Sequence, residues 1–134
     1  MSSGNNKIIS CLCGGIQLKI KGPLRHVSNC HCRQCMKTHG NYAAYTNALE
    51  KDIKFIKKIT LKWFKSSKKA RRGFCNKCGA SIFFKFLRSD NISIAAGMFK
   101  NPTKLKTTTN IFVKGKLDYY KLDSRLPKFS RYSK

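Results

Sequence analysis

The chain has 134 residues, of which 41% are hydrophobic, and a formal net charge of +24 that results from 29 Lys and Arg against five Asp and Glu. This length and composition are typical of one globular domain and exclude a generally disordered chain. No apolar run approaches the roughly 20 residues that span a bilayer, and the polar start MSSGNNK lacks the apolar core of a secretory signal. The positive charge attracts phosphates, carboxylates and nucleic acid without selecting one of them, and its scatter along the chain favours a solvated basic surface.

The first part of the chain predicts short strands and one short helix. Residues 7–22 predict two short strands around a Cys-Gly turn, and in the second of them Ile16, Leu18 and Ile20 alternate with polar side chains. Residues 26–32 predict an extended segment. Residues 33–40 predict one or two helical turns that end at Gly40.

The remaining elements are predicted to be strands and turns. Single strands are predicted over residues 42–46, 59–64, 91–99 and 107–113. Residues 70–86 predict a hairpin with Cys75 and Cys78 at its turn. Residues 101–105 predict a turn or a short helix, and residues 118–132 predict a coil-rich closing segment.

Together these elements predict one domain over residues 7–132, preceded by a flexible polar tail over residues 1–6. The predicted fold class is mostly β, with several short antiparallel sheets and little helix. We find no internal repeat, linker or low-complexity block that would divide the chain.

All seven cysteines lie in three short clusters, and an odd number in close clusters argues against a disulfide framework. Reduced thiols bound to metal fit better, which predicts a cytoplasmic protein. Two of the clusters are the pairs Cys11-Leu-Cys13 and Cys75-Asn-Lys-Cys78. The two pairs could supply the four ligands of a tetrahedral, structural zinc ion. Unmetallated buried cysteines and an iron–sulfur cluster are the alternatives.

The third cluster is one ligand short of a closed zinc site. Its members are Cys30, Cys32 and Cys35. A zinc ion held by three protein ligands keeps a fourth position for water or substrate, which is typical of catalytic sites. His26, His31 and His39 are the residues that could close the site, and His39 has the most suitable spacing. A redox dithiol of Cys32 and Cys35 is another alternative.

An open position on zinc suits a sulfur ligand, because zinc is borderline-soft and deprotonates a bound thiol. The hypothesis is therefore a second, catalytic zinc ion that binds a small thiol. Arg71 and Arg72 lie just before Cys75. We predict that they contact anions such as the carboxylates of a small acidic thiol, and a solvated basic face is the competing interpretation.

Several motifs occur in a recognisable order: CLCGGIQLKIKGP, NCHCRQCMKTHG, RRGFCNKCGASIFF, ISIAAGMF and LPKFSRY. Over residues 7–132 the chain resembles the glutathione-dependent formaldehyde-activating enzyme (GFA) family, whose domain also occurs in centromere protein V. The resemblance implies a zinc-bound, tent-like antiparallel β fold. It also implies a structural zinc at the two cysteine pairs and a catalytic zinc at the three-cysteine cluster. The implied reaction joins glutathione and formaldehyde to S-hydroxymethylglutathione, or reverses that step.

One segment departs from the family pattern. Family members often carry His-Ile-Phe or His-Ile-Trp, followed by a Pro-Trp pair, near the C-terminus. This chain has Asn110-Ile111-Phe112 and later Tyr119-Tyr120. If this segment lines the pocket, the substrate differs from that of other members.

The leading functional hypothesis is a zinc-dependent carbon–sulfur lyase or synthase that acts on thiol–aldehyde adducts. Cys30, Cys32 and Cys35 are its predicted catalytic metal ligands. His31, His39 or a bound water molecule is the predicted proton donor.

The alternative is a zinc module that binds nucleic acid or protein without catalysis. Residues 51–72 hold ten Lys and Arg, interleaved with Phe55, Trp63 and Phe64. Bases can stack on such rings where a basic groove follows the phosphate backbone. Packing of the three rings in the core is the competing interpretation.

Overall fold

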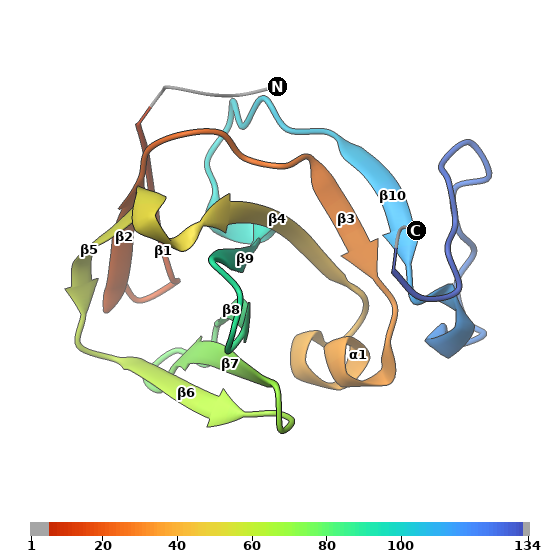
Figure 1. Ribbon diagram of the computed structural model, residues 1–134, viewed down its shortest axis with the longest axis horizontal. Helices are drawn as coiled ribbons and strands as arrows, with labels where there is room; N and C mark the ends of the chain where they lie inside the picture. Colours follow the sequence, from red (N-terminus) through yellow and green to blue (C-terminus); the bar gives the residue numbers. More distant parts are fainter. Residues whose placement is uncertain (1–5, 133–134) are drawn as a thin grey trace.

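The structure is a computed structural model that describes residues 6–132 (Figure 1). Within these residues, ten strands form two sheets, accompanied by one α-helix and three short 3₁₀ helices. The prediction of a mostly β fold with little helix is confirmed. The tail predicted over residues 1–6 falls outside the described residues, apart from Asn6. Within the described part, the helices are too short and too polar to span a bilayer.

The smaller sheet consists of β1 (Lys7–Ser10), β2 (Ile16–Ile20) and β5 (Ile53–Lys58), in the order β1-β2-β5. All its pairings are antiparallel. The predicted pair of strands around a Cys-Gly turn is β1 and β2. Strand β5 was not predicted, because its sequence IKFIKK is rich in lysine and only Ile53 and Phe55 turn a half-buried side chain inward.

The larger sheet has seven strands in the order β10-β3-β4-β9-β8-β7-β6. Their bounds are β3 Val27–Cys30, β4 Ala43–Leu49, β6 Leu61–Lys65, β7 Ala70–Cys75, β8 Ser81–Phe86, β9 Asn91–Ala95 and β10 Thr107–Ile111. Every neighbouring pair is antiparallel except β3 and β10, which are parallel. A parallel pair needs a long crossover connection, and here most of the chain lies between the two strands.

Helix α1 (Arg33–His39) begins and ends at residues that the sequence marks. The sulfur of Cys32 caps its N-terminus by accepting a hydrogen bond from the Cys35 backbone N–H at 3.3 Å. Gly40 ends the helix in the left-handed conformation, with φ +83°, and its N–H donates to the Met36 carbonyl. Glycine adopts this conformation without the steric cost that a Cβ would add.

The three 3₁₀ helices cover Glu50–Asp52, Ala96–Met98 and Val113–Gly115. The second of them ends the strand predicted over residues 91–99 early, at Ala95. The turn or short helix predicted over residues 101–105 is irregular chain with a bend at its start.

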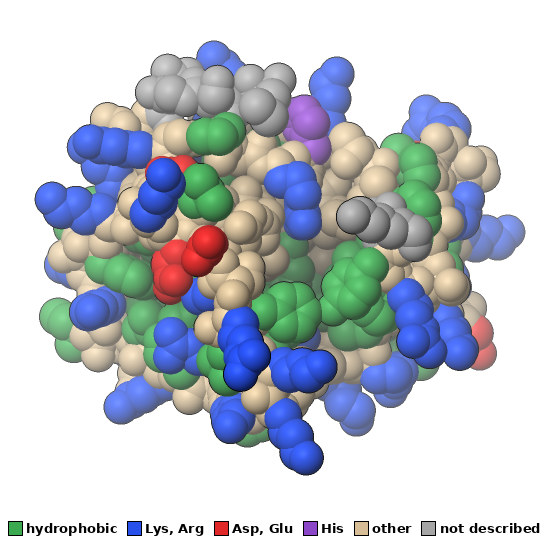
Figure 2. Space-filling model, in the orientation of Figure 1, with side chains coloured by type: hydrophobic (Ala, Val, Ile, Leu, Met, Phe, Trp, Pro, Cys, Tyr) green, Lys and Arg blue, Asp and Glu red, His purple; other side chains and the backbone are tan. Residues whose placement is uncertain are grey.

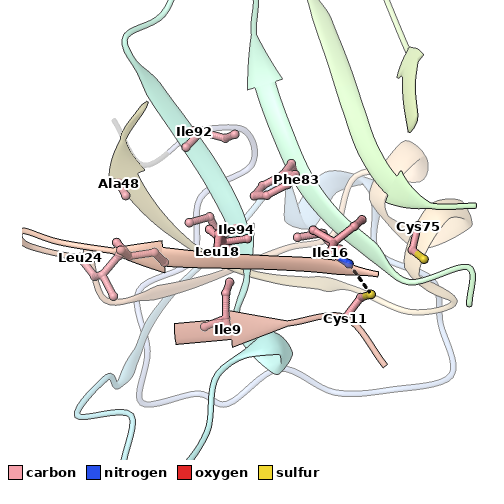
Figure 3. Packing of buried hydrophobic residues seen from close by; sticks show 12 residues of the cluster. Ile9, Cys11, Ile16, Leu18, Leu24, Ala48, Cys75, Phe83, Ile92 and Ile94 are labelled. Atoms are coloured by element: carbon pink, nitrogen blue, oxygen red, sulfur yellow. Dashed lines mark hydrogen bonds between the residues drawn. The ribbon is translucent and has the colours of Figure 1, made fainter. Parts of the chain in front are cut away.

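The main core lies between the two sheets (Figure 3). Ile9 and Leu18 of the smaller sheet face Phe83 and Ile94 of the larger one. Each of these side chains is almost fully buried. Burial of one such side chain contributes about 1.5–3 kcal/mol to the free energy of unfolding. Cys11 lies within the same cluster, so a metal site borders directly on the core.

The chain after β10 returns along the outer edge of the larger sheet (Figure 1). The Asn110 N–H donates to the Pro127 carbonyl at 3.0 Å, and the Phe112 N–H donates to the Arg131 carbonyl at 2.8 Å. We call residues 127–132 the C-terminal segment. It covers the backbone groups of an edge strand that would otherwise be open to pairing with another chain.

Candidate metal centres

The structure brings the two cysteine pairs together, although 61 residues separate Cys13 from Cys75 in the sequence. Cys11 and Cys13 lie in the turn between β1 and β2, whereas Cys75 is the last residue of β7 and Cys78 lies in the turn between β7 and β8. We call these four residues the four-cysteine site. Their sulfurs all lie within 4.8 Å of one another.

The donor set of the four-cysteine site fits a zinc ion. With Zn–S bonds of about 2.3 Å, tetrahedral geometry puts the sulfurs about 3.8 Å apart. The observed Cys13–Cys75 and Cys11–Cys13 sulfur distances are 3.5 and 3.7 Å. Backbone N–H groups of Gly15 and Ile16 donate to two of the sulfurs, at 3.4 Å each. Such donors stabilise thiolates.

The other cluster is the three-cysteine site, formed by Cys30, Cys32 and Cys35. Cys30 is the last residue of β3, Cys32 caps α1, and Cys35 lies in its first turn. This junction of strand and helix points three sulfurs at one place, again within 4.8 Å of one another.

The thiols of the three-cysteine site differ in pKa. Hydrogen bonds from Cys30 and then Cys35 lower the pKa of Cys32 to about 2. The pKa of Cys30 is raised, first by its hydrogen bond to Cys32 and further by burial. Three like charges this close cannot form together without a cation. The three-cysteine site therefore fits a metal ion, with which all three thiols would ionise.

Within residues 6–132, no histidine or carboxylate joins the three sulfurs as a fourth ligand. The Nε2 atom of His39 is instead hydrogen-bonded to the Tyr45 hydroxyl at 2.9 Å. Burial, together with the nearby charge of Arg72, lowers the pKa of His39 to about 4. His26 accepts a hydrogen bond from the Lys106 N–H through Nδ1.

His31 lies between Cys30 and Cys32 and is almost fully buried. Its Nε2 atom is hydrogen-bonded to Asn110 Oδ1 at 2.8 Å and its Nδ1 atom to the Tyr120 hydroxyl at 2.6 Å. Burial lowers the pKa of this imidazole. A proton-donor role for His31 would require one of these hydrogen bonds to open.

All three cysteines of this site line a cavity of about 420 Å³. The cavity lies over the face of the larger sheet formed by β3, β4, β8 and β9, and it also reaches β10 and the C-terminal segment. Figure 2 shows this face of the molecule hollowed near its centre, with hydrophobic and basic side chains around the hollow. The three-cysteine site is therefore open to a small molecule, whereas the four-cysteine site already has a complete ligand set.

Residues 6–115 match the sequence profile of a family described as glutathione-dependent formaldehyde-activating enzyme, abbreviated GFA. The chain belongs to the GFA family. A crystal structure of a Rhodobacter sphaeroides protein from a structural-genomics programme has a similar fold, with a TM-score of 0.61 and 14% sequence identity over 90% of this chain and 98% of that one. Among curated proteins, none matches the chain significantly.

The two neighbouring arginines of this GFA domain have different surroundings. Arg72 is only 6% exposed and lines the cavity. Its guanidinium donates to Cys35 Sγ at 3.4 Å, to the Tyr45 hydroxyl at 3.0 Å and to Gln34 Oε1 at 2.7 Å. Arg71 points to the other face of β7, where its guanidinium lies 3.9 Å from the centre of the Trp63 ring.

The basic stretch of the GFA domain keeps one of its three rings exposed. Phe55 and Trp63 both pack against Phe83, with ring centroids 5.9 and 5.7 Å apart. Phe64 is 59% exposed. Two of the three rings proposed to stack on bases therefore pack against the core instead.

Sequence reasoning missed the rings that line the cavity of the GFA domain. These are Tyr45, Phe84, Phe86, Phe112 and Tyr132. They come from four separate parts of the chain, so no local spacing could have connected them. The only available signal was the departure at Asn110-Ile111-Phe112.

Proposed function

We propose that this member of the GFA family is a zinc-dependent carbon–sulfur lyase or synthase that adds a small thiol such as glutathione to an aldehyde such as formaldehyde, and reverses that addition. One observation carries the proposal: three sulfurs without a fourth protein ligand among the described residues face a cavity of about 420 Å³. The family description supports it. The single domain of residues 7–132 would contain both metal sites.

A zinc ion held by Cys30, Cys32 and Cys35 would supply an open position that lowers the pKa of a substrate thiol. Arg72 contributes a positive charge beside Cys35, which offsets the negative charge that three thiolates and an incoming thiol bring together. The buried position of Arg72 strengthens this interaction, because little water screens it.

The reaction conserves atoms and electrons without a further reactant. The thiol sulfur donates an electron pair to the carbonyl carbon, and the π pair of the carbonyl moves to oxygen. That oxygen takes up the proton that the thiol has lost. Because His31 and His39 are hydrogen-bonded to other side chains, a water molecule in the cavity is the proton donor that requires no rearrangement.

The polar side of the cavity suits a thiol that carries carboxylates. Arg25, Asn47 and Asn91 line it, and no Asp or Glu does so among the described residues. A positive field without an opposing acid attracts an anionic substrate. We assign no such contact to Arg71, which points away from the cavity.

Native mass spectrometry with metal counting tests the metal assignment. We expect two zinc ions per chain, one of which is lost in Cys32→Ser while the other is retained. Exchange between ¹³C-formaldehyde and its glutathione adduct, measured by NMR, tests the activity. The wild-type protein should accelerate this exchange, and Cys32→Ser should abolish the acceleration while the fold persists.

Two results would reject the proposal. The first is unchanged exchange in the presence of the two-zinc protein, which would favour a module without catalysis. The second is acceleration that survives in Cys32→Ser.

A further inference from the structure

The cavity beside the three-cysteine site has an aromatic wall, which we define as Phe84, Phe86, Phe112 and Tyr132. The rings form a continuous row. The Phe84 and Phe86 centroids are 5.0 Å apart, those of Phe86 and Tyr132 are 6.4 Å apart, and those of Tyr132 and Phe112 are 4.7 Å apart. These are the tilted and edge-to-face arrangements that aromatic rings favour.

The wall is assembled from three distant parts of the chain. Phe84 and Phe86 lie on β8, Phe112 directly follows β10, and Tyr132 belongs to the C-terminal segment. Phe112 has a left-handed backbone with φ +54°, which is costly for a residue with a Cβ. The hydrogen bond from its N–H to Arg131 joins it to the segment that carries Tyr132. The chain thus holds Phe112 at the wall despite an unfavourable backbone.

Part of the wall faces water when the cavity is empty. Phe86 is 39% exposed and Tyr132 is 54% exposed. A formaldehyde adduct carries a single hydroxymethyl group on sulfur, which is too small to cover several rings. An aromatic or bulky apolar group on the same carbon would bury them.

Other residues of the cavity are already suited to the thiol. Asn47 and Asn91 lie at the polar side, joined by a hydrogen bond of 2.7 Å, and the Asn47 Nδ2 group donates to the Ser93 hydroxyl oxygen at 3.1 Å. These groups match the peptide and carboxylate atoms of a molecule such as glutathione. The aromatic wall is therefore left for the aldehyde part of the adduct.

We infer that the preferred adduct carries an aromatic group from its aldehyde, which packs on the aromatic wall. This inference rests on the proposed function, because it concerns the substrate class of the same site. The bond formed is still the one between sulfur and the carbonyl carbon, and the carbonyl oxygen still takes the proton. Only the group attached to that carbon differs from the hydrogen of formaldehyde.

Binding of two stable thioethers tests the inference without turnover. Calorimetry on the zinc-loaded protein compares S-benzylglutathione with S-methylglutathione. We expect S-benzylglutathione to bind about tenfold more tightly, since a buried ring gains apolar contact and ring–ring interaction. Tyr132→Ala and Phe86→Leu should each reduce this preference several-fold.

Matched control variants are available at exposed aromatic residues outside the cavity. Tyr119→Ala removes an exposed tyrosine outside the cavity, and Phe64→Leu changes an exposed phenylalanine on β6. Both should keep the preference of the wild type. Equal binding of the two thioethers, binding of neither, or a preference that survives in both cavity variants would overturn the inference.

The same proteins distinguish this inference from the proposed function. Acceleration of formaldehyde exchange with equal thioether binding would leave the lyase proposal standing and reject the aromatic substrate. A wall-dependent preference for S-benzylglutathione without acceleration of any adduct would reject the lyase proposal and leave an aromatic binding site. With both intact, the adduct of glutathione and 3-phenylpropanal should exchange faster than the formaldehyde adduct, and Tyr132→Ala should reverse that order.

Discussion

Arg72 of β7 connects this strand to α1 and β4 through one side chain. Its guanidinium bonds to Gln34 of α1, to Tyr45 of β4 and to the sulfur of Cys35. It also lies 4.9 Å from the ring centre of Phe84 in the aromatic wall. A buried cation with several acceptors fixes both the geometry and the charge of the cavity.

We expect Arg72→Gln to raise the KM for the thiol about tenfold, because the incoming negative charge loses its partner. The loss of hydrogen bonds from a charged donor should also lower the free energy of unfolding by about 2 kcal/mol. Arg72→Lys keeps the charge, so its KM should lie close to that of the wild type. Its free energy of unfolding should stay lowered. Steady-state kinetics and urea denaturation measure the two effects.

Arg71→Gln is the matched control for this prediction, because Arg71 stacks on Trp63 outside the cavity. It should leave the KM unchanged. A KM that rises equally in Arg71→Gln and Arg72→Gln would show that the general positive field matters rather than the contact with Cys35.

At the scale of elements, β10 and the chain beyond it hold residues 30–32 through His31. The imidazole is buried between Asn110 of β10 and Tyr120. The Tyr120 hydroxyl also contacts the sulfur of Met36 in α1, at 3.6 Å. His31, which lies between Cys30 and Cys32, is therefore anchored by the edge strand of the larger sheet and by the chain beyond it.

Tyr120→Phe removes the hydroxyl that bonds to His31 and should lower the free energy of unfolding by about 1 kcal/mol. The neighbouring Tyr119→Phe is a close control, since the Tyr119 hydroxyl bonds to Asn41 at the exposed surface. We expect that change to stay within about 0.5 kcal/mol. Urea denaturation of both variants gives the comparison, and equal losses would contradict the anchoring role.

Elements with local signals could be predicted from the sequence. Helix α1 was marked by Gly40, and β2 by alternating apolar residues. Strand β5 was missed because lysines fill its exposed positions at an edge, where charged side chains discourage pairing with other chains. The parallel pairing of β10 with β3 depends on contacts across most of the chain, which no local pattern encodes.

In the sites, too, features with a local sequence signal could be predicted, and features that depend on distant contacts could not. Cysteine spacing predicted both clusters, because short turns bring sulfurs together wherever they occur. The surroundings of the clusters could not be predicted. Arg72 and Arg71 are adjacent in the sequence and both basic, yet strand alternation sends one to the cavity and the other to Trp63.

For the whole molecule, the four-cysteine site links the two sheets, because its halves come from turns of different sheets. Structural zinc contributes roughly 10–16 kcal/mol to folding in zinc-finger peptides, and a whole domain has a net stability of about 5–15 kcal/mol. The net positive charge makes folding depend still more on this metal site, because repulsion between like charges destabilises the compact chain. Among the described residues only two ion pairs form, Lys85–Glu50 and Arg125–Asp123, against a net charge of +24.

Loss of a metal ion bound at the four-cysteine site should therefore unfold the protein. We expect Cys13→Ser, or treatment with a strong chelator, to abolish the cooperative thermal transition near physiological temperature. Cys32→Ser should lose one metal ion and keep most of the melting temperature. Circular dichroism with metal analysis measures both, and a Cys13→Ser protein as stable as the wild type would contradict the prediction.

The C-terminal segment also has a practical consequence for handling the protein. A purification tag fused behind this segment would be tethered close to Tyr132, which lines the cavity. Such an extension would compete with small molecules for the rings there and distort affinities measured in the laboratory. A tag at the opposite end would precede β1, whose residues do not line the cavity.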